Sequence, residues 1–406
     1  MKETKFKQTE VGMIPRDWEV ACLGDLGSFK NGISKPAEKF GHGFPFVNLM
    51  DIFEKTSIKG NEEFGLIESV SSEQQMYSLR RGDVLFVRSS VKPEGVGLTT
   101  VVKKDLSKTV FSGFILRFRE LGERLNTDYK EFVFYSDYFR RNLIASSTVS
   151  ANTNINQPAL KKLIIAFPKS IEEQQRIANA LSDVDTLINN LEKLIAKKKN
   201  IKQGAMQQLL TGKKRLPGFA PAKPTYKQTE LGKIPADWEV KNIGKLLKIG
   251  HGRDYKNLKS GNVPVYGTGG YMTSVNDYLY EGETVCIGRK GTIDKPFYHT
   301  GKIWTVDTLF YTYGFNGCIP KFIYYAFCLV DWLAMNEASG VPSLTSKNIE
   351  DVLLRIPPSK AEQTAIANVL SDMDAEISAL ETKLAKYRTL KTGMMQQLLT
   401  GKIRLV

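Results

Sequence analysis

The sequence predicts an α+β protein in which two globular, mainly-β domains alternate along the chain with two long, paired helices. Three observations lead to this prediction. The 406 residues are too many for one compact core, two separate stretches each occur twice, and one repeated stretch has the apolar spacing of a coiled coil. We expect a long antiparallel two-helix coiled coil and a pseudo-twofold, circular organisation of the whole chain.

The repeats separate a constant frame from variable inserts. Residues 7–20 (KQTEVGMIPRDWEV) return at 227–240 as KQTELGKIPADWEV, and residues 170–216 align without a gap to 359–405, with 27 of 47 positions identical. The offsets are 220 and 189 residues, so the segment between the matches is longer in the first copy. The inserts, 21–169 and 241–358, look almost unrelated. This pattern favours a recognition protein, whose frame persists while its specificity varies.

Two helices are expected within the longer repeat. Apolar residues recur there at alternating spacings of four and three, which is typical of the a/d seam of a coiled coil. The predicted seam consists of Ile177, Leu181, Val184, Ile188, Leu191 and Ile195 in the first copy, and of Ile366, Leu370, Met373, Ile377, Leu380, Leu384 and Tyr387 in the second.

Capping residues mark the ends of both helices. Ser170 and Ser359 are expected N-caps, and Gly212 and Gly401 are expected C-terminal stops. Each helix then spans about 40 residues, or roughly 60 Å. The first helix leaves one domain and arrives at the other, so a second helix that packs along it must run back. The predicted boundaries are 1–169 for the first domain, 170–216 for the first helix, 217–226 for a linker, 227–358 for the second domain and 359–406 for the second helix.

One junction occurs twice, once intact and once broken. In mid-chain LLTGKKRL continues through the Pro-rich linker, expected to be extended, into YKQTELGKIPADWEV. The chain ends with LLTGKIRLV and begins with a closely similar KFKQTEVGMIPRDWEV. The two termini are therefore expected to lie close together. Within the domains, strands are expected near 83–88, 113–118, 284–287 and 308–313, and helices near 129–144 and 321–335.

Charge and cysteine usage limit the function classes. A net charge of +14 attracts polyanions, because neutralising phosphates releases condensed counterions. The four cysteines are scattered without a CxxC pair, which argues against a disulfide framework or a zinc site. The N-terminus lacks the apolar core of a signal peptide and no apolar run reaches membrane-spanning length. We expect a cytoplasmic protein with no membrane partner.

Three motifs, each present twice, carry a family resemblance. They are EQxxIAxxLSD (Glu173–Asp183, Glu362–Asp372), MQQLLTGKxRL (Met206–Leu216, Met395–Leu405) and GxIPxDWEV (Gly12–Val20, Gly232–Val240). In these motifs and their order, the whole chain resembles the specificity (S) subunit of type I restriction-modification enzymes.

The resemblance implies a fold and a division of labour among subunits. It implies two target-recognition domains, each reading one half of a split site in double-stranded DNA, and helices that set the half-site spacing and dock two modification (methyltransferase) subunits. Restriction (translocase/endonuclease) subunits would join this core. S-adenosylmethionine, ATP and Mg²⁺ would be bound by the partner subunits and no cofactor by this chain, and the methylated base would be adenine. Since the two inserts differ, the implied site is asymmetric.

Candidate DNA-contacting residues follow from side-chain chemistry rather than from the resemblance. Arginine suits guanine, asparagine and glutamine suit adenine, and lysine suits phosphate. In the first domain we favour Lys30, Asn31, Arg80 and Arg81, and the run of Arg88, Ser89, Ser90 and Lys92 that follows a predicted strand. In the second domain we expect the corresponding element at Arg289 and Lys290, after the predicted strand 284–287, and add His251, Arg253, Tyr255, Lys256, Thr268 and Tyr271. A lone surface Arg or Lys is more often simply solvated.

Two sets of helix residues allow a choice of roles. The first set lies off or beyond the simple seam and consists of Leu187, Leu194, Met206 and Leu209. These residues either belong to additional core or form a docking stripe for partner helices, and we favour docking for some of them. The lysines between 193 and 202 either lie over the DNA spacer or form a solvated outer face.

No catalytic motif is evident. There is no GxxxxGK(S/T) loop and no NPPY-like segment, and the three histidines are dispersed without metal-ligand spacing. We therefore expect a non-catalytic subunit. Two alternatives remain: a coiled-coil scaffold whose basic domains bind protein or RNA, and a nuclease with an unrecognised site.

Overall fold

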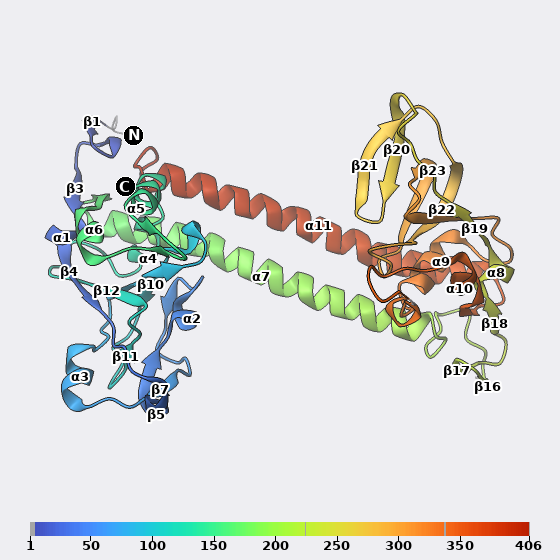
Figure 1. The fold of residues 1–406 in the computed structure, drawn as a ribbon, viewed down its shortest axis with the longest axis horizontal. Coiled ribbons are helices and arrows are strands. Elements are labelled where there is room, and N and C mark those ends of the chain that lie inside the picture. Colours follow the sequence, from blue (N-terminus) through green and yellow to red (C-terminus); the bar gives the residue numbers. More distant parts are fainter. Residues whose placement is uncertain (1–4, 224, 337, 406) are drawn as a thin grey trace. The chain divides into compact units, whose positions relative to one another are not determined.

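The structure is a computed structural model that describes residues 5–223, 225–336 and 338–405. The chain divides into two compact units. Unit 1 holds the chain up to Leu191 together with Lys383 onward, and unit 2 holds Glu192–Thr382. Each unit contains one mixed α/β domain and a part of each of two long helices (Figure 1).

The two long helices match the predicted length of about 40 residues. They are α7 (Ile171–Leu209) and α11 (Lys360–Leu398), each of 39 residues. The N-cap predictions are confirmed, because Ser170 Oγ accepts the Glu173 N–H at 3.1 Å and Ser359 Oγ accepts the Glu362 N–H at 3.2 Å. Beyond the helix ends Gly212 and Gly401 have φ values of +72° and +68°, the left-handed conformation that stops a helix.

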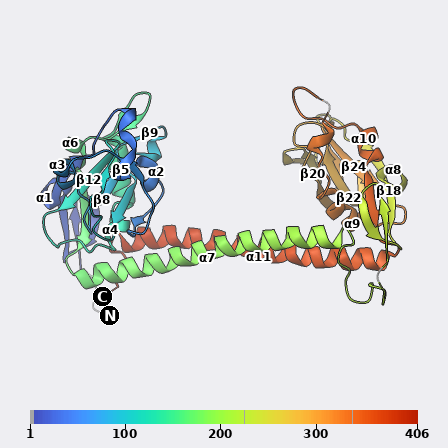
Figure 2. The same ribbon diagram turned by 90° about the horizontal axis from the view of Figure 1, so that it is seen from below.

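Within each unit α7 and α11 lie side by side and run antiparallel (Figure 2). In unit 2, Lys198 and Lys202 pair with Glu376 and Asp374, so residue numbers rise on one helix as they fall on the other. In unit 1, Asp185 pairs with Lys391 at 2.5 Å. The Asp185–Lys391 and Asp374–Lys202 pairs are equivalent under the 189-residue offset. The ion pairs therefore repeat the pseudo-twofold relation of the sequence.

The helix interface buries most of the seam. All six seam positions of α7 are buried, at 9% exposure or less. In α11 the buried positions are Ile366, Leu370 and Ile377, whereas Met373, Leu380, Leu384 and Tyr387 are half-buried.

The domain of unit 1 is built on a five-stranded sheet. In spatial order its strands are β4 (Gly27–Asn31), β12 (Ile115–Glu120), β8 (Val84–Val87), β10 (Thr99–Val102) and β6 (Ser57–Ile58). A second sheet has the order β11 (Val110–Phe111), β5 (Phe40–Val47) and β7 (Gly65–Ile67). The pairs β10–β6 and β11–β5 are parallel and the others are antiparallel. Smaller ladders are β1 (Phe6–Thr9) with β2 (Gly12–Pro15), β3 (Trp18–Cys22) with β15 (Ile164–Pro168), and β9 (Ser89–Ser90) with β14 (Thr153–Asn154) and β13 (Thr148–Val149).

The domain of unit 2 is built on a six-stranded sheet. In spatial order its strands are β19 (Lys248–His251), β24 (Leu309–Tyr313), β22 (Tyr280–Gly288), β23 (Phe297–Thr305), β20 (Ser260–Gly267) and β21 (Gly270–Val275). Only β20 and β23 among these neighbours pair in parallel. Two further ladders are β16 (Tyr226–Thr229) with β17 (Gly232–Pro235), and β18 (Glu239–Asn242) with β25 (Leu353–Ile356).

Short helices complete both domains. In unit 1 they are α1 (Leu23–Leu26), α2 (Leu49–Ile52), α3 (Ser71–Met76), α4 (Lys130–Val133), α5 (Asp137–Ala145) and α6 (Gln157–Lys162), and in unit 2 they are α8 (Ile243–Leu246), α9 (Pro320–Phe327) and α10 (Ser346–Asp351). The predicted helices near 129–144 and 321–335 are therefore interrupted: the first is α4 plus α5, and the second is α9 plus a 3₁₀ turn at Leu333–Met335.

The two domains share a topology although their sequences look unrelated. The strand order β4–β12–β8–β10 in unit 1 corresponds to β19–β24–β22–β23 in unit 2. Loop hydrogen bonds correspond as well: the Ile33 N–H donates to Phe111 O and the Arg253 N–H to Thr305 O, both at 2.8 Å. The inserts are therefore two versions of one fold, which the sequence comparison did not reveal.

The repeated junction is held by an equivalent ion cluster in each unit. Arg404 contacts Asp17 and Glu173 in unit 1, and Arg215 contacts Asp237 and Glu362 in unit 2. Because Asp17 and Arg404 lie near opposite ends of the chain, the predicted closeness of the termini is confirmed. The Arg404 guanidinium beside Asp17 holds the pKa of that carboxyl below its usual range. The linker prediction was partly wrong, since residues 217–219 form a turn and β16 begins at Tyr226.

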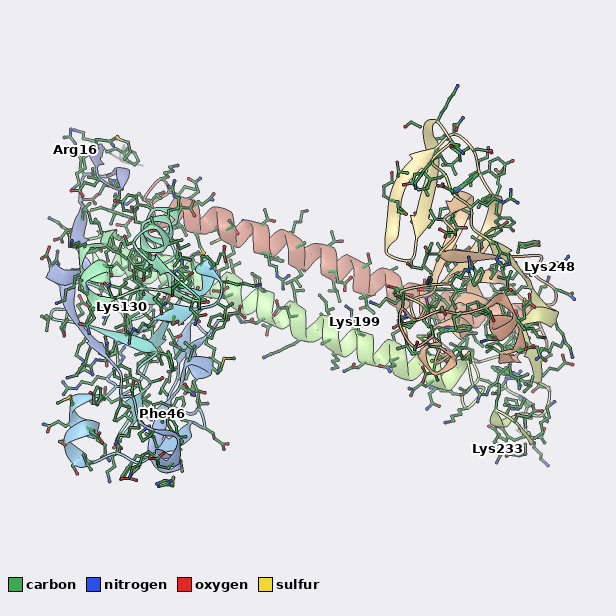
Figure 3. All side chains as sticks on the ribbon, viewed as in Figure 1. Arg16, Phe46, Lys130, Lys199, Lys233 and Lys248 are labelled. Atoms are coloured by element: carbon green, nitrogen blue, oxygen red, sulfur yellow. The ribbon has the colours of Figure 1, made fainter. Side chains whose placement is uncertain are left out.

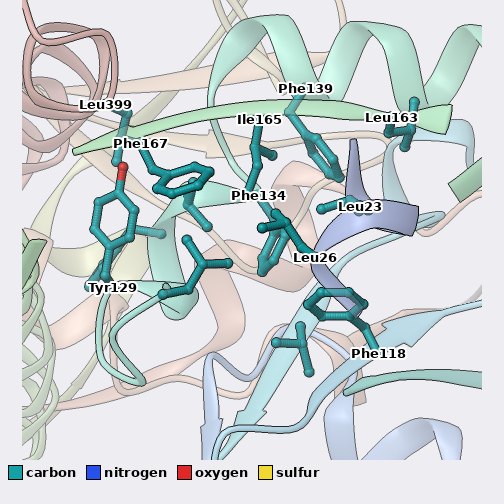
Figure 4. Close-up of a cluster of buried hydrophobic side chains, with 14 of the residues drawn as sticks. Leu23, Leu26, Phe118, Tyr129, Phe134, Phe139, Leu163, Ile165, Phe167 and Leu399 are labelled. Carbon is teal, nitrogen blue, oxygen red and sulfur yellow. The ribbon is translucent and has the colours of Figure 1, made fainter. Parts of the chain in front are cut away.

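Each unit has a core to which the long helices contribute. In unit 1, Leu399, one residue beyond α11, lies beside Tyr129 and Phe167 (Figure 4). Leu398, the last residue of α11, belongs to the same cluster, so the end of this helix joins the domain that the N-terminal chain builds. The tryptophans of the repeated DWEV segments, Trp18 and Trp238, are fully buried in the respective cores. Lys130, shown inside unit 1 in Figure 3, is buried but paired with Glu120 at 2.8 Å.

Replacing Gly401 by alanine is expected to lower the free energy of unfolding by about 1–3 kcal/mol, because a non-glycine residue is strained at this φ. The added Cβ would also lie 2.5 Å from Pro15 Cδ. Gly393→Ala is the matched control: it lies inside α11 with no neighbour near its added Cβ and should stabilise by about 0.5–1 kcal/mol. Urea unfolding of both variants checks this, and an equally stable Gly401→Ala would contradict it.

Candidate nucleic-acid interface

In unit 1 several loops meet at one edge of the main sheet. β4 and β8 end there and β12 begins there, since Asn31 pairs with Leu116 and Val87 with Ile115. Arg88 directly follows β8, and its Nη1 donates to Gly113 O at 3.1 Å. The structure therefore brings together Asn31 and Arg88, two residues that the sequence analysis selected separately.

A hollow of about 300 Å³ lies at this edge. Its lining consists of Asn31, Arg88, Asn156, Gln157, Pro158 and Lys161. The side-chain amides of Gln157 and Asn31 approach to 2.7 Å. Helix α6 positions Gln157, because Asn156 caps that helix by accepting the Ala159 N–H at 2.9 Å. The hollow thus presents amide and cationic groups, which are the groups that recognise base edges and phosphates.

The adjoining part of the same edge is apolar. Ser89, Ser90 and Lys92 line a larger hollow of about 950 Å³ together with Met50, Val91 and Phe114, among other residues. Phe114 is 60% exposed and precedes β12 directly. An exposed apolar group beside polar ones is suited to contact with a thymine methyl.

In unit 2 the corresponding edge gathers most of the candidates of the second domain. His251 ends β19, Arg253 follows it, and Arg289 and Lys290 follow β22. The N–H groups of Arg253 and Arg289 donate to Thr305 O and Thr308 O, both at 2.8 Å. Thr268 lies at the same edge, because a Cβ added to Gly291 would be 3.4 Å from its Oγ1.

Arg88 and Arg289 occupy equivalent positions. Each follows the third strand of the sheet, and Arg289 Nη1 donates to Asp307 O at 3.2 Å as Arg88 does to Gly113 O. Their N–H groups donate to Phe114 O (2.9 Å) and Thr308 O (2.8 Å), respectively. The same arginine pose thus recurs in both domains.

The structure separates three other candidates from this edge. Arg80 and Arg81 precede β8, at the opposite end from Arg88 and roughly 20 Å away along the strand. Their N–H groups donate to Asp83 and Asp105. Lys30 points to the face opposite Asn31, as neighbours in a strand do, and lies 5.4 Å from the Tyr77 ring. Lys30, Arg80 and Arg81 therefore do not lie with Asn31 and Arg88 at this edge.

Two further arginines near that opposite end are engaged within the domain. Arg117 is 7% exposed, and its burial together with nearby Arg119 lowers its pKa to about 10. Arg119 pairs with Asp83 at 2.6 Å. These two arginines therefore do not present a free cationic surface.

The remaining candidates of the second domain differ in exposure. Tyr255 is half-buried against the apolar cluster around Trp304, so it contributes to packing. Lys256 is exposed, as is Tyr271, whose hydroxyl lies 3.0 Å from Ser274 Oγ. The His251 ring is exposed and meets Phe310 edge-on with centroids 5.1 Å apart.

The candidate docking residues of α7 divide into two pairs. Leu187 and Leu194 are 45% and 37% exposed, and Ile201, seven residues further along the same stripe, is 46% exposed. Met206 and Leu209 are buried at 7% and 5% in the core of unit 2. Met206 and Leu209 therefore correspond to the core alternative, because their side chains are already covered within this chain.

The helix lysines mostly brace α7 against α11. Lys198, Lys199 and Lys202 pair with Glu376, Glu381 and Asp374. Lys199 remains 56% exposed, and Figure 3 shows it projecting from α7. These charges are engaged within the helix pair, which argues against a role over the DNA spacer.

Sequence reasoning missed Gln157, which lines the polar hollow of unit 1, and Phe114, which lines the adjoining apolar hollow. Gln157 and Phe114 carry no motif, and Gln157 lies 126 residues from Asn31, the residue that it contacts. The only available signal was Asn156 before Gln157-Pro158, a typical helix start, and it points to a helix rather than to a site.

Two searches of the described residues gave no further sites. In residues 5–223, 225–336 and 338–405, no group of three or more His, Cys, Asp or Glu side chains is placed to hold a metal ion. In the same part of the chain, none of the helices combines the length and the apolar character that crossing a bilayer requires.

Comparison with known proteins agrees with this architecture. The family model described as the type I restriction modification DNA specificity domain matches residues 15–203 and 235–386. The MjaX and MjaIX specificity subunits of type I restriction enzymes of Methanocaldococcus jannaschii are 29% and 23% identical to this chain, each match covering 99% of this chain and 97% of the relative. The S subunit crystal structure from M. genitalium has a TM-score of 0.60 at 16% identity, over 97% of this chain and 98% of that one.

The paired domains and the matching family model together define a DNA specificity subunit with an internal repeat. The chain belongs to the type I restriction-modification DNA specificity family, as the motif resemblance predicted. It is the non-catalytic target-recognition specificity subunit of such a system.

Proposed function

We propose that the two domains read the two halves of a split, asymmetric site in double-stranded DNA, one half-site each. The observation that supports this most directly is the equivalent edge in both domains, with Arg88 and Arg289 in the same pose beside polar residues that differ. One fold with different edge residues is suited to reading two different short sequences. The net charge of +14 favours binding to the phosphate backbone.

We further propose that α7 and α11 set the distance between the half-sites and dock two modification subunits. Each 39-residue helix is about 58 Å long. This length exceeds one turn of DNA, which is about 34–36 Å. Leu187 and Leu194 are exposed apolar residues of α7. A partner subunit that covers them would remove this apolar surface from water, which favours the complex.

The cofactors belong to the partner subunits in this proposal. The modification subunits bind S-adenosylmethionine and methylate adenine, and the restriction subunits use ATP and Mg²⁺. This chain supplies recognition only, and the complex works in the cytoplasm.

The test is selection of duplexes from a random DNA pool by the chain assembled with its modification subunits. We expect a split motif with two different half-sites and a constant spacer, bound at least roughly 10³-fold more tightly than unrelated DNA. Mapping N6-methyladenine in cells with and without the chain should return the same motif. An unsplit motif, or enrichment from an RNA pool but not from DNA, would contradict the proposal, and RNA enrichment would favour the scaffold alternative.

A further inference from the structure

We propose that each domain divides its DNA contacts between a shared arginine, which holds the sugar-phosphate backbone, and divergent neighbours, which read the bases. The shared residues are Arg88 and Arg289. The divergent positions are Asn31, Phe114 and Gln157 in unit 1 and their counterparts His251, Thr308 and Ser346 in unit 2. This inference rests on the proposed function, because it assumes that the two edges contact DNA.

Hydrogen bonding establishes the equivalence of the two arginines. Each guanidinium donates through Nη1 to a main-chain carbonyl two residues before the strand that lies beside its own in the sheet. The carbonyl is Gly113 O before β12 in unit 1 and Asp307 O before β24 in unit 2. The main-chain carbonyl of Arg88 accepts the Ile155 N–H at 3.0 Å, and that of Arg289 accepts the Leu344 N–H at 2.9 Å. Both arginines are therefore held at the backbone and at one side-chain nitrogen.

The rest of each guanidinium is available to a ligand. Within the described residues, neither Arg88 nor Arg289 makes a further side-chain hydrogen bond, so Nε and Nη2 remain to donate. Arg88 lines the polar hollow and Arg289 is exposed. A guanidinium with two free donor nitrogens matches two phosphate oxygens.

The pairing of a shared residue with divergent neighbours indicates what each contacts. Two different half-sites have different base edges but the same phosphate backbone. A residue that keeps its identity and pose in both domains is suited to the feature common to both half-sites. Residues that change between the domains are suited to the features that differ.

The divergent positions are equivalent by hydrogen bonding and register. Asn31 and His251 end the first strand, and each pairs with the second residue of the neighbouring strand, Leu116 or Phe310. Gln157 and Ser346 begin the helices that Asn156 and Thr345 cap. The carbonyls of Phe114 and Thr308 accept the N–H groups of the two arginines.

The chemistry of these positions differs between the units. In unit 1 the amides of Asn31 and Gln157 touch in the polar hollow, and the exposed Phe114 ring lines the adjoining apolar hollow. Amides match the edge of adenine and an apolar ring matches the thymine methyl, so unit 1 is suited to an A·T pair at this place. In unit 2 an imidazole and two hydroxyls present a different set of donors and acceptors.

The experiment compares Arg88→Gln with the double variant Asn31→Ala, Gln157→Ala in the assembled complex. For Arg88→Gln we expect binding about tenfold weaker or more on every sequence, an unchanged selected motif and a salt-dependence slope smaller by about 1. For the double variant we expect discrimination reduced by roughly 5- to 150-fold at one or two base pairs of one half-site, with the other half-site intact. Arg81→Gln, which removes a charge at the far end of β8, is the matched control. It should leave both the affinity with its salt dependence and the discrimination between bases unchanged.

Two outcomes would overturn the inference. The first is an altered base preference in Arg88→Gln with the salt slope unchanged, since Arg88 would then read a base. The second is a uniform loss of affinity in the double variant with the motif unchanged. Thermal midpoints establish that each variant is folded, and Arg289→Gln provides a second, independent measurement. Failure of the proposed function itself is distinct, because the wild-type complex would then select no split motif.

Discussion

Replacing Arg215 by methionine is expected to lower the free energy of unfolding by about 3–5 kcal/mol. Arg215 donates through Nε and Nη2 to the carboxylate of Glu362, which is 1% exposed, at 2.8 and 2.6 Å. Its Nη1 donates to Asp237 as well. Methionine keeps the apolar volume but leaves the Glu362 charge buried without a partner, which is the costly situation. Urea denaturation followed by circular dichroism measures the loss.

Two companion variants distinguish this cause from a general effect of lost charge. Lys214→Met removes an exposed neighbouring charge and should change stability by less than about 0.5 kcal/mol. Adding Glu362→Leu to Arg215→Met should recover a large part of the loss, because the unpaired charge is then absent. Equal stability of Arg215→Met and Lys214→Met would refute the expectation. Arg404→Met should produce the same loss in unit 1, where Arg404 binds Glu173.

Replacing Gln363 by leucine is expected to lower the free energy of unfolding by about 2–4 kcal/mol. The Gln363 side chain is fully buried and accepts the Ile319 N–H at 3.0 Å. It also donates to Gly317 O at 3.0 Å and Pro357 O at 3.2 Å. Leucine fills similar space but leaves three backbone groups without their partner, of which only the Pro357 carbonyl belongs to a buried residue. A buried unpaired group costs about 1–3 kcal/mol, and the two less buried groups cost less. Thermal and urea unfolding provide the measurement.

The repeat supplies an internal test of this explanation. Gln174 is the equivalent residue of unit 1; it accepts the Asn126 N–H at 2.7 Å and donates to Arg124 O and Pro168 O at 2.8 and 2.7 Å. Gln174→Leu should therefore show a loss of similar size. Thr364→Ala, next to Gln363 but exposed, is the control and should stay within about 1 kcal/mol of wild type. A mild effect in both glutamine variants would be incompatible with the explanation.

These glutamines also explain why the EQ pair stands at the start of each long helix. The glutamate holds the junction arginine, and the glutamine ties two backbone segments, one at Gly317–Ile319 and one at Pro357, to the helix. A motif recognised in the sequence as a family signature thus has a structural cause. The sequence indicated that the pair matters, but Ile319 is 44 residues from Gln363 and Arg215 is 147 residues from Glu362, and local patterns carry no information about such partners.

The sequence predicted Arg88 and Arg289 as corresponding residues because each follows a run of β-forming residues. It did not separate them from Arg80 and Arg81, which look equally cationic. The register of β8 separates them, since residues at opposite ends of one strand cannot share an edge. In the same way, the sequence does not distinguish Met206 and Leu209 from Leu187 and Leu194. The structure does, because the core of unit 2 buries the first pair and leaves the second pair exposed.

The sequence by itself determined the repeated frame, the two long helices with their caps and stops, the apolar seam and the closeness of the termini. These features depend on local spacing and on internal identity, which are both visible in one dimension. Only the tertiary structure decided that the unlike inserts share one topology, and that Asn31, Arg88, Gln157 and Phe114 meet at one edge. The physical reason is that strand order, parallel pairing and burial arise from contacts between residues far apart in the chain, and different sequences satisfy them equally well.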